Sequence, residues 1–137
     1  MTQQQAILFA ERNRDAFNRF DPQAITALYE LPCVFSQEVV PAVFSDHAAL
    51  LDNSTRLVEF YRQDGLETVA FADIKVDSFG ERHALVDVQW TLTRREKPSV
   101  SFRTAYNLRC FDGDWKIWAI TVYEERAAFA RDTAQAH

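Results

Sequence analysis

The spacing of hydrophobic positions changes along this chain, from three or four residues in the first half to two residues in the second. Over residues 3–20 the positions with helical spacing are Ala6, Phe9, Ala10, Asn13, Phe17 and Phe20. They predict an amphipathic helix. Asp21-Pro22 predicts a second, short helix, because aspartate caps a helix start and proline fits the first turn. We expect Leu31-Pro32 to end it, since a residue before proline avoids helical geometry.

A third helix is predicted between Ser45, a capping residue, and Gly65, which adopts the left-handed conformation that often ends helices. Its buried stripe consists of Leu50, Leu51, Ser54, Leu57, Val58 and Tyr61. Residues 33–40 and 41–44, which precede this helix, are predicted as a strand and a short partner strand.

Alternating patterns then predict four long strands, over residues 67–79, 82–94, 99–111 and 115–125. Gly80, residues 96–98 and Asp112-Gly113 supply short connections, so consecutive antiparallel hairpins are expected. Helices followed by strands predict an α+β fold. We expect one domain over residues 1–137, with its core at about 5–125 and a tail at 126–137 that is helical or frayed.

Composition excludes several classes of partner. The chain has 137 residues, of which 47% are hydrophobic, and this length can bury a core without disulfides. Its 15 basic and 20 acidic residues lack the basic stripe that nucleic acid requires. No signal peptide or membrane-length apolar run is found, and Cys33 and Cys110 lie in strand-like segments that predict buried free thiols. We therefore expect a cytoplasmic protein with no nucleic-acid or membrane partner, no metal and no cofactor.

The order of elements and two segments resemble the nuclear transport factor 2-like superfamily. The segments are Phe111-Asp112-Gly113-Asp114-Trp115-Lys116-Ile117 and residues 20–29, which is similar to the family's second helix. The resemblance implies a cystatin-like cone, with three N-terminal helices packed on a curved antiparallel sheet and a pocket between them. Because isomerases, dehydratases, hydrolases, polyketide cyclases and adaptor domains share this fold, it indicates no particular activity.

The ketosteroid isomerase branch of the superfamily uses a carboxylate base, with a tyrosine and a protonated aspartate as oxyanion hole. An ungapped comparison places the base at Gln37, the tyrosine at Asn13 and the aspartate at Asn107. Gln37 cannot accept a proton near neutral pH, so the resemblance implies that this isomerisation is absent. A shift of one residue would instead bring Glu38 to the base position.

Strand 99–111 has one apolar and one polar face. The resemblance places Asn107, and with it Arg103, on the pocket side. The apolar set would then cover the outer face, where it predicts a homodimer interface. The reverse assignment, with the arginines in solvent and no large interface, stays open. Trp90 and Trp118 are predicted as pocket or core walls, and Asp87 as a rim or interface residue.

Three functional interpretations follow. In the first, a small organic molecule binds a partly apolar pocket, and Arg103 favours a carboxylate or polarised oxygen. The predicted pocket residues are Asn13, Phe17, Tyr29, Phe35, Gln37, Tyr61, Trp90, Arg103, Asn107 and Trp118. The second is an isomerase, cyclase or hydrolase whose base is Glu38, Asp87, His47 or Glu124. The third is an association module with a filled core. A carboxylate in the cleft would favour the enzyme, and a cleft lined by amides and Arg103 would favour binding.

Overall fold

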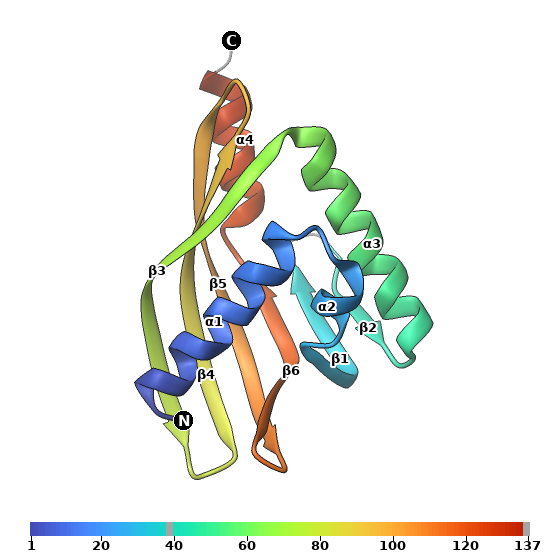
Figure 1. Cartoon of the computed structure of the whole chain (residues 1–137), viewed down its shortest axis with the longest axis vertical. Helices are drawn as coiled ribbons and strands as arrows, with labels where there is room; N and C mark the ends of the chain where they lie inside the picture. Colours follow the sequence, from blue (N-terminus) through green and yellow to red (C-terminus); the bar gives the residue numbers. More distant parts are fainter. Residues whose placement is uncertain (38–39, 136–137) are drawn as a thin grey trace.

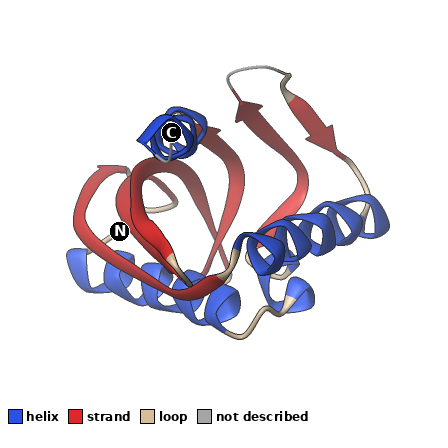
Figure 2. Cartoon of the chain, turned by 90° about the horizontal axis from the view of Figure 1, so that it is seen from above, coloured by secondary structure: helices blue, strands red, loops and turns tan. Residues whose placement is uncertain are grey.

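The computed structural model describes residues 1–37 and 40–135, with side chains through residue 130. Its sheet is strongly curved, and the long helices lie along its concave side (Figures 1 and 2). The strands are ordered β2-β1-β6-β5-β4-β3. Neighbouring strands are antiparallel, except that β1 and β6 are parallel. The predicted α+β, cystatin-like arrangement of helices on a curved sheet is confirmed.

The helices are α1 (Gln3–Asn18), α2 (Pro22–Thr26), α3 (His47–Asp64) and α4 (Glu125–Gln135). The predicted tail is thus helical where it is described. Asp21 caps α2 as predicted, with its carboxylate accepting from the Ala24 amide at 3.1 Å. The N-cap of α3 is Asp46 rather than the predicted Ser45, and its carboxylate accepts from the Ala49 amide at 2.8 Å. Because Asp46 lies three residues before this amide, its carboxylate can accept the hydrogen bond that the first turn of the helix leaves unpaired.

The strands are β1 (Tyr29–Gln37), β2 (Ala42–Phe44), β3 (Leu66–Phe79), β4 (His83–Arg94), β5 (Lys97–Phe111) and β6 (Asp114–Val122). Strand β1 begins four residues before the predicted strand, so Leu31-Pro32 lies inside it, across a cis peptide bond. Its pairing with β6 changes register between Tyr29 and Val34, where proline supplies no amide for the ladder. The last part of the predicted strand includes residues 38–39, which lie outside the described residues.

Strand β5 faces the helices with its apolar side, so the predicted placement of its two faces is wrong. Its buried residues are Val100, Phe102, Thr104, Tyr106 and Leu108. Arg103 and Asn107 alternate with them and lie on the outer face. Burying the apolar set against the helices removes more hydrocarbon from water than burying the polar set would, which explains the orientation.

Strand β6 contains a bulge at Trp118. Asn107 pairs with Ala119 and Leu108 pairs with Ile117, so Trp118 is the extra residue. The bulge shifts the alternation, and Ile117 and Ile120 are therefore both buried. Trp118 itself is 40% exposed on the outside, so its prediction as a pocket or core wall is wrong.

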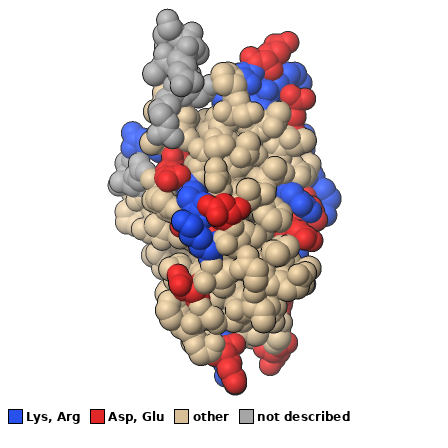
Figure 3. All heavy atoms as spheres, turned by 90° about the vertical axis from the view of Figure 1, so that its left-hand side faces the viewer, with Lys and Arg blue, Asp and Glu red and all other residues tan. Residues whose placement is uncertain are grey.

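Neither cysteine forms a disulfide; Cys33 is buried and Cys110 is half-buried. No helix in the described part of the chain is long and apolar enough to cross a membrane. Over the face shown in Figure 3, acidic and basic side chains are interspersed among uncharged residues. That face has no continuous basic stripe among its described residues.

Candidate functional site

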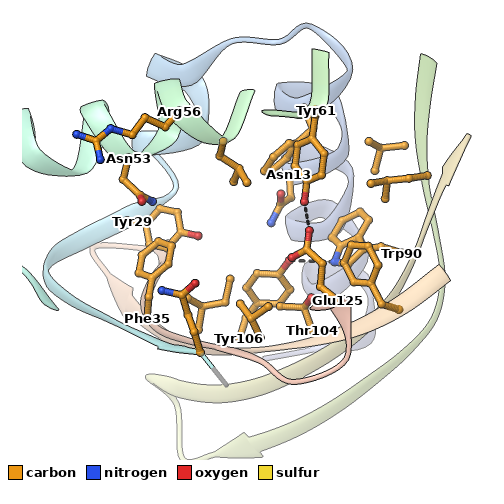
Figure 4. Close-up of a pocket in the computed structure, with 18 residues that line it drawn as sticks. Asn13, Tyr29, Phe35, Asn53, Arg56, Tyr61, Trp90, Thr104, Tyr106 and Glu125 are labelled. Carbon is orange, nitrogen blue, oxygen red and sulfur yellow. Dashed lines mark hydrogen bonds between the residues drawn. The ribbon is translucent and has the colours of Figure 1, made fainter. Parts of the chain in front are cut away.

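A cavity of about 320 Å³ lies between the curved sheet and the helices. Helices α1 and α3, strands β1 and β3–β6 and the start of α4 all contribute lining residues. Most of the wall is aromatic or aliphatic, and Figure 4 shows these side chains turned toward a common space. The aromatic members are Phe17, Tyr29, Phe35, Tyr61, Trp90, Phe102 and Tyr106.

The aromatic walls are held by contacts with one another. Phe17 and Tyr61 meet edge to face with ring centroids 5.8 Å apart, and Tyr29 stacks on Phe35 at 5.2 Å. Pairs of this geometry contribute about 0.5–1.5 kcal/mol beyond the area they bury. The rings on α1, α3 and β1 thus support one another around the cavity without a ligand.

Glu125, the first residue of α4, brings a carboxyl group to the cavity. The Tyr61 hydroxyl donates a hydrogen bond to its Oε1 atom (Figure 4). Burial raises the pKa of Glu125, and the hydrogen bond from Tyr61 opposes that rise. Burial and the neighbouring carboxylate raise the pKa of Tyr61, so this phenol keeps its proton. Among the described residues, no lysine, arginine or histidine forms an ion pair with Glu125.

A second hydrogen-bonded pair lies beside Glu125. The Trp90 indole N–H donates to the Tyr106 hydroxyl at 2.9 Å, across neighbouring strands β4 and β5. Burial raises the pKa of Tyr106, while hydrogen bonding with Trp90, Asn13 and Thr104 opposes the rise. Because Tyr106 accepts from Trp90 and remains protonated, its own hydroxyl proton is available as a donor.

Three longer polar side chains lie at the solvent end of the lining. Gln37 is exposed and donates to the Val40 carbonyl at 3.2 Å. Arg56 is paired with Asp52 at 2.7 Å, one turn earlier on α3, and points largely into solvent. Asn53 is half-buried next to them. The charged head of Arg56 therefore lies in solvent, away from the hydrogen-bonded pair of Tyr61 and Glu125 (Figure 4).

Seven of the ten predicted pocket residues line this cavity: Asn13, Phe17, Tyr29, Phe35, Gln37, Tyr61 and Trp90. Arg103, Asn107 and Trp118 do not. Arg103 binds two carboxylates on the outer face, with Nε 2.5 Å from Asp87 and an Nη atom 2.9 Å from Asp73. The prediction that Arg103 favours a ligand carboxylate in the pocket is wrong, because its guanidinium points away from the cavity and is already neutralised.

The three predicted bases that the structure describes are not brought to the cavity. Asp87 accepts from Arg103 and from the Tyr123 hydroxyl, the latter at 2.8 Å. His47 begins α3 and is exposed, and Glu124 accepts from the Arg103 backbone amide at 2.8 Å and does not line the cavity. Glu38 lies outside the described residues.

Sequence reasoning missed Glu125, Thr104 and Tyr106. Thr104 and Tyr106 were assigned to the outer face together with the rest of the apolar set. Glu125 follows directly on Glu124 at the end of the last predicted strand, where the chain turns into α4. Strand alternation no longer applies there, so the sequence carries no signal that separates an inward from an outward carboxylate.

The described residues contain no cluster of three or more histidine, cysteine, aspartate or glutamate side chains that could hold a metal ion. The lining instead offers the carboxyl group of the half-buried Glu125, three tyrosine hydroxyls, a threonine hydroxyl, three amides, the guanidinium of Arg56 and aromatic faces. Such a set can bind a small molecule, donate hydrogen bonds to it, or exchange a proton with it.

A helix-and-curved-sheet cone with a cavity between its layers defines a protein of the nuclear transport factor 2-like class. A family model described as "NTF2-like protein (DUF6841)" matches residues 6–125. The chain belongs to this family, which confirms the predicted resemblance. No protein with a curated description matches it.

Solved structures show the same fold at low sequence identity. An NTF-2 like protein of unknown function from Shewanella oneidensis is 15% identical, with a TM-score of 0.70 over 88% of this chain and 98% of that one. A ketosteroid isomerase-like protein from Erwinia carotovora atroseptica is 21% identical, with a TM-score of 0.64 over 85% and 90%. A protein with a ketosteroid isomerase-like fold from Catenulispora acidiphila, in complex with trimethylamine, is 13% identical, with a TM-score of 0.63 over 92% of each chain.

Proposed function

We propose that this protein is a small-molecule-binding domain whose ligand occupies the cavity lined by Glu125, Tyr61 and Tyr106. The observation that carries the proposal is the cavity itself, which is about 320 Å³ in volume and has polar groups set among mostly apolar walls. Small-molecule sites have this composition, with apolar walls for affinity and few polar groups for orientation. A filled core was the expectation for a pure association module, and the cavity argues against it.

Binding is tested by thermal unfolding of the purified protein with a library of neutral, cationic and anionic organic molecules. A ligand at 100 times its dissociation constant should add about 2.7 kcal/mol to the free energy of unfolding. Thr104→Phe, which fills the cavity from β5, should abolish the stabilisation. Asn107→Ala, on the outer face of the same strand, should retain it. The proposal would be contradicted if none of the compounds stabilised the protein, or if Thr104→Phe and Asn107→Ala lost the ligand-dependent stabilisation to the same extent.

A second candidate is acid–base catalysis in the same cavity, and the Glu125–Tyr61 pair favours it. A carboxyl group with a raised pKa exchanges protons near neutral pH more readily than an ordinary glutamate, and Tyr106 can donate to a developing oxyanion. The test is turnover of each compound that binds. If the site is catalytic, Glu125→Gln should abolish turnover while binding persists. Recovery of every bound compound unchanged after prolonged incubation would contradict catalysis and leave binding as the only function.

Homodimerisation through the outer sheet face is also proposed, now on different residues from those first predicted. Trp118 is 40% exposed there, next to Ala119, which pairs with Asn107 across the β5–β6 ladder. The residues from Met1 to Phe129 contribute to one hydrophobic core, which supports a single domain. The free thiols of Cys33 and Cys110 support a cytoplasmic location.

A further inference from the structure

The Glu125 carboxyl group has no positive partner among the described residues. Tyr61 on α3 donates one hydrogen bond to it, and the other groups at this end of the cavity are Tyr106, Trp90 and Asn13, none of which is a cation (Figure 4). Of the nearby basic residues, Arg56 pairs with Asp52, and Arg94 pairs with Asp64 at 2.9 Å. Arg126 follows Glu125 on α4 and lines the adjoining groove with it, but no ion pair joins the two among the described residues. Buried carboxylates in proteins are usually paired, so a positive group from outside would complete this site.

The aromatic walls favour the same sign of charge. The faces of tyrosine, tryptophan and phenylalanine rings carry negative potential, and they attract a cation within about 6 Å of the ring centre. Tyr61 and Phe17 on the helices, with Trp90 on the sheet, present rings to the cavity. Two independent features, a carboxyl group and a set of rings, thus make the same end of the cavity favourable to positive charge.

An anionic ligand is disfavoured by the same groups. It would meet Glu125 in a site of low polarity, where like charges repel strongly. The basic side chain first expected to receive it, Arg103, lies on the opposite face with Asp87 and Asp73. A neutral ligand with a carbonyl group remains compatible with a protonated Glu125, and experiment must distinguish it from a cation.

We propose that the cavity binds a small organic ammonium ion, with its charged nitrogen between the Glu125 carboxylate and the rings of Tyr61 and Trp90. This inference rests on the proposed function and names its ligand class. The alkyl groups of the ligand would contact Phe17 and the aliphatic lining, and Tyr61 would hold the carboxylate in place. Burial raises the pKa of Glu125 in the unliganded protein, and a bound cation would restore its ionisation.

The inference is tested with three probes of nearly the same shape and different charge: choline, its neutral carbon analogue 3,3-dimethyl-1-butanol, and the anion 3,3-dimethylbutanoate. Titration calorimetry measures the affinity of each for the wild-type protein. Choline should bind at least about tenfold more tightly than the neutral analogue, the combined effect of the carboxylate and the rings. The anion should bind most weakly.

Three variants assign the effect to its source. Glu125→Gln keeps the size of the side chain and its ability to accept from Tyr61, and it should reduce the preference for choline to the part that the rings supply, without weakening binding of the neutral alcohol. Glu124→Gln is the same change one residue earlier, on the outer side, and should leave all three affinities unchanged. Phe17→Leu replaces one ring by an aliphatic group and should weaken choline binding more than alcohol binding.

The outcomes separate this inference from the function on which it rests. Equal affinity of the wild-type protein for choline and the alcohol would show that the site does not select a cation, and a preference left unchanged by Glu125→Gln would show that Glu125 does not contact the cation. In both cases the cavity would still be a binding site. Binding of only neutral or anionic members of the larger library would overturn the inference in the same way. If no member of any charge class binds, the proposed function itself fails.

Discussion

Glu125 is the residue on which the chemistry of the cavity depends, because it holds a titratable group in largely apolar surroundings. Its neighbours supply a hydrogen bond from Tyr61 but no positive charge among the described residues. The ionised form is therefore less well solvated in the folded chain than in the unfolded chain. Burial is the dominant cause of the raised pKa, and it links protonation of Glu125 to the stability of the fold.

Replacement of Glu125 by glutamine should stabilise the protein at neutral pH. The pKa of Glu125 is higher in the folded than in the unfolded state, so its stabilising contribution is complete below the unfolded pKa of about 4.3 and is lost as the pH rises through the folded pKa. We expect Glu125→Gln to raise the free energy of unfolding by about 1 kcal/mol at pH 7.5, which corresponds to about 3–5 °C in Tm. At pH 4 the two proteins should have the same Tm.

The measurement is thermal unfolding of both proteins from pH 4 to pH 8, with Glu124→Gln as the matched control. Burial raises the pKa of Asp64, but Lys97 and Arg94 lower it further, so the fold loses stability when Asp64 is protonated in acid. This loss is common to all three proteins and cancels in the difference. A loss of stability in Glu125→Gln at pH 7.5 would mean that the carboxylate has a favourable partner and would remove the basis for expecting a cation.

The point at which each helix ends affects the geometry of the cavity as much as the length of the helix does. Helix α3 ends at Gly65, which has a φ of 89°, and the Gly65 carbonyl accepts from the Arg95 amide at 2.8 Å. That bond joins the end of α3 to the β4–β5 turn. Because Tyr61 lies one turn earlier on the same helix, the sharp exit at Gly65 also fixes how the Tyr61 side chain meets Glu125.

Gly65→Ala should therefore destabilise the fold through backbone strain alone. An added Cβ atom would lie 3.5 Å from the Arg95 nitrogen, an ordinary contact, whereas the left-handed conformation costs a residue with a side chain about 1–2 kcal/mol. Asparagine tolerates that conformation better, so Gly65→Asn should lose less stability than Gly65→Ala in urea unfolding. A larger loss in Gly65→Asn than in Gly65→Ala would show that side-chain crowding, rather than φ, decides the cost.

The bulge at Trp118 is a second local feature, within strand β6, that shapes the cavity. It turns Ile120 and Val122 toward the cavity while Ile117 remains in the core. A regular strand would bury either Ile117 or Ile120, but not both. The same extra residue leaves Trp118 on the outside of the sheet, so one irregularity serves both the cavity wall and the outer surface.

For the whole molecule, the open question is what covers the outer sheet face. That face combines the exposed Trp118 with the Asp73–Arg103–Asp87 cluster, in which Tyr123 takes part. Tryptophan is enriched at the centres of interfaces, and the charged cluster would lie at its side. The predicted homodimer would use this surface.

Trp118→Glu should convert a dimer into a monomer, since a charge at the centre of an interface costs several kcal/mol. Light scattering after size-exclusion chromatography at micromolar concentration gives the mass directly, against 15.8 kDa for one chain. Phe79→Glu, which changes another exposed aromatic residue at the tip of the β3–β4 hairpin, is the control and should leave the mass unchanged. A wild-type mass of one chain would contradict the dimer.

Much of this architecture is contained in the sequence because local physics determines it. Three-and-four spacing, the cap at Asp21, the end of α3 at Gly65 and the hairpin turns specify the three N-terminal helices and the antiparallel hairpins of the last four strands. Each of these signals acts within a few residues, where sequence and geometry correspond directly. The aromatic positions that line the cavity from the helices and from β1 were accessible for the same reason.

Only the tertiary structure decided which face of the sheet points inward and which carboxylate enters the cavity. Alternation groups Arg103 with Asn107 and Thr104 with Tyr106, but the side that each group faces depends on burial against helices far away in the sequence. The bulge at Trp118 breaks the alternation without a glycine or proline to mark it. The placement of Glu125 inside and Glu124 outside follows from the turn of α4 against β5, a contact between elements that no local pattern encodes.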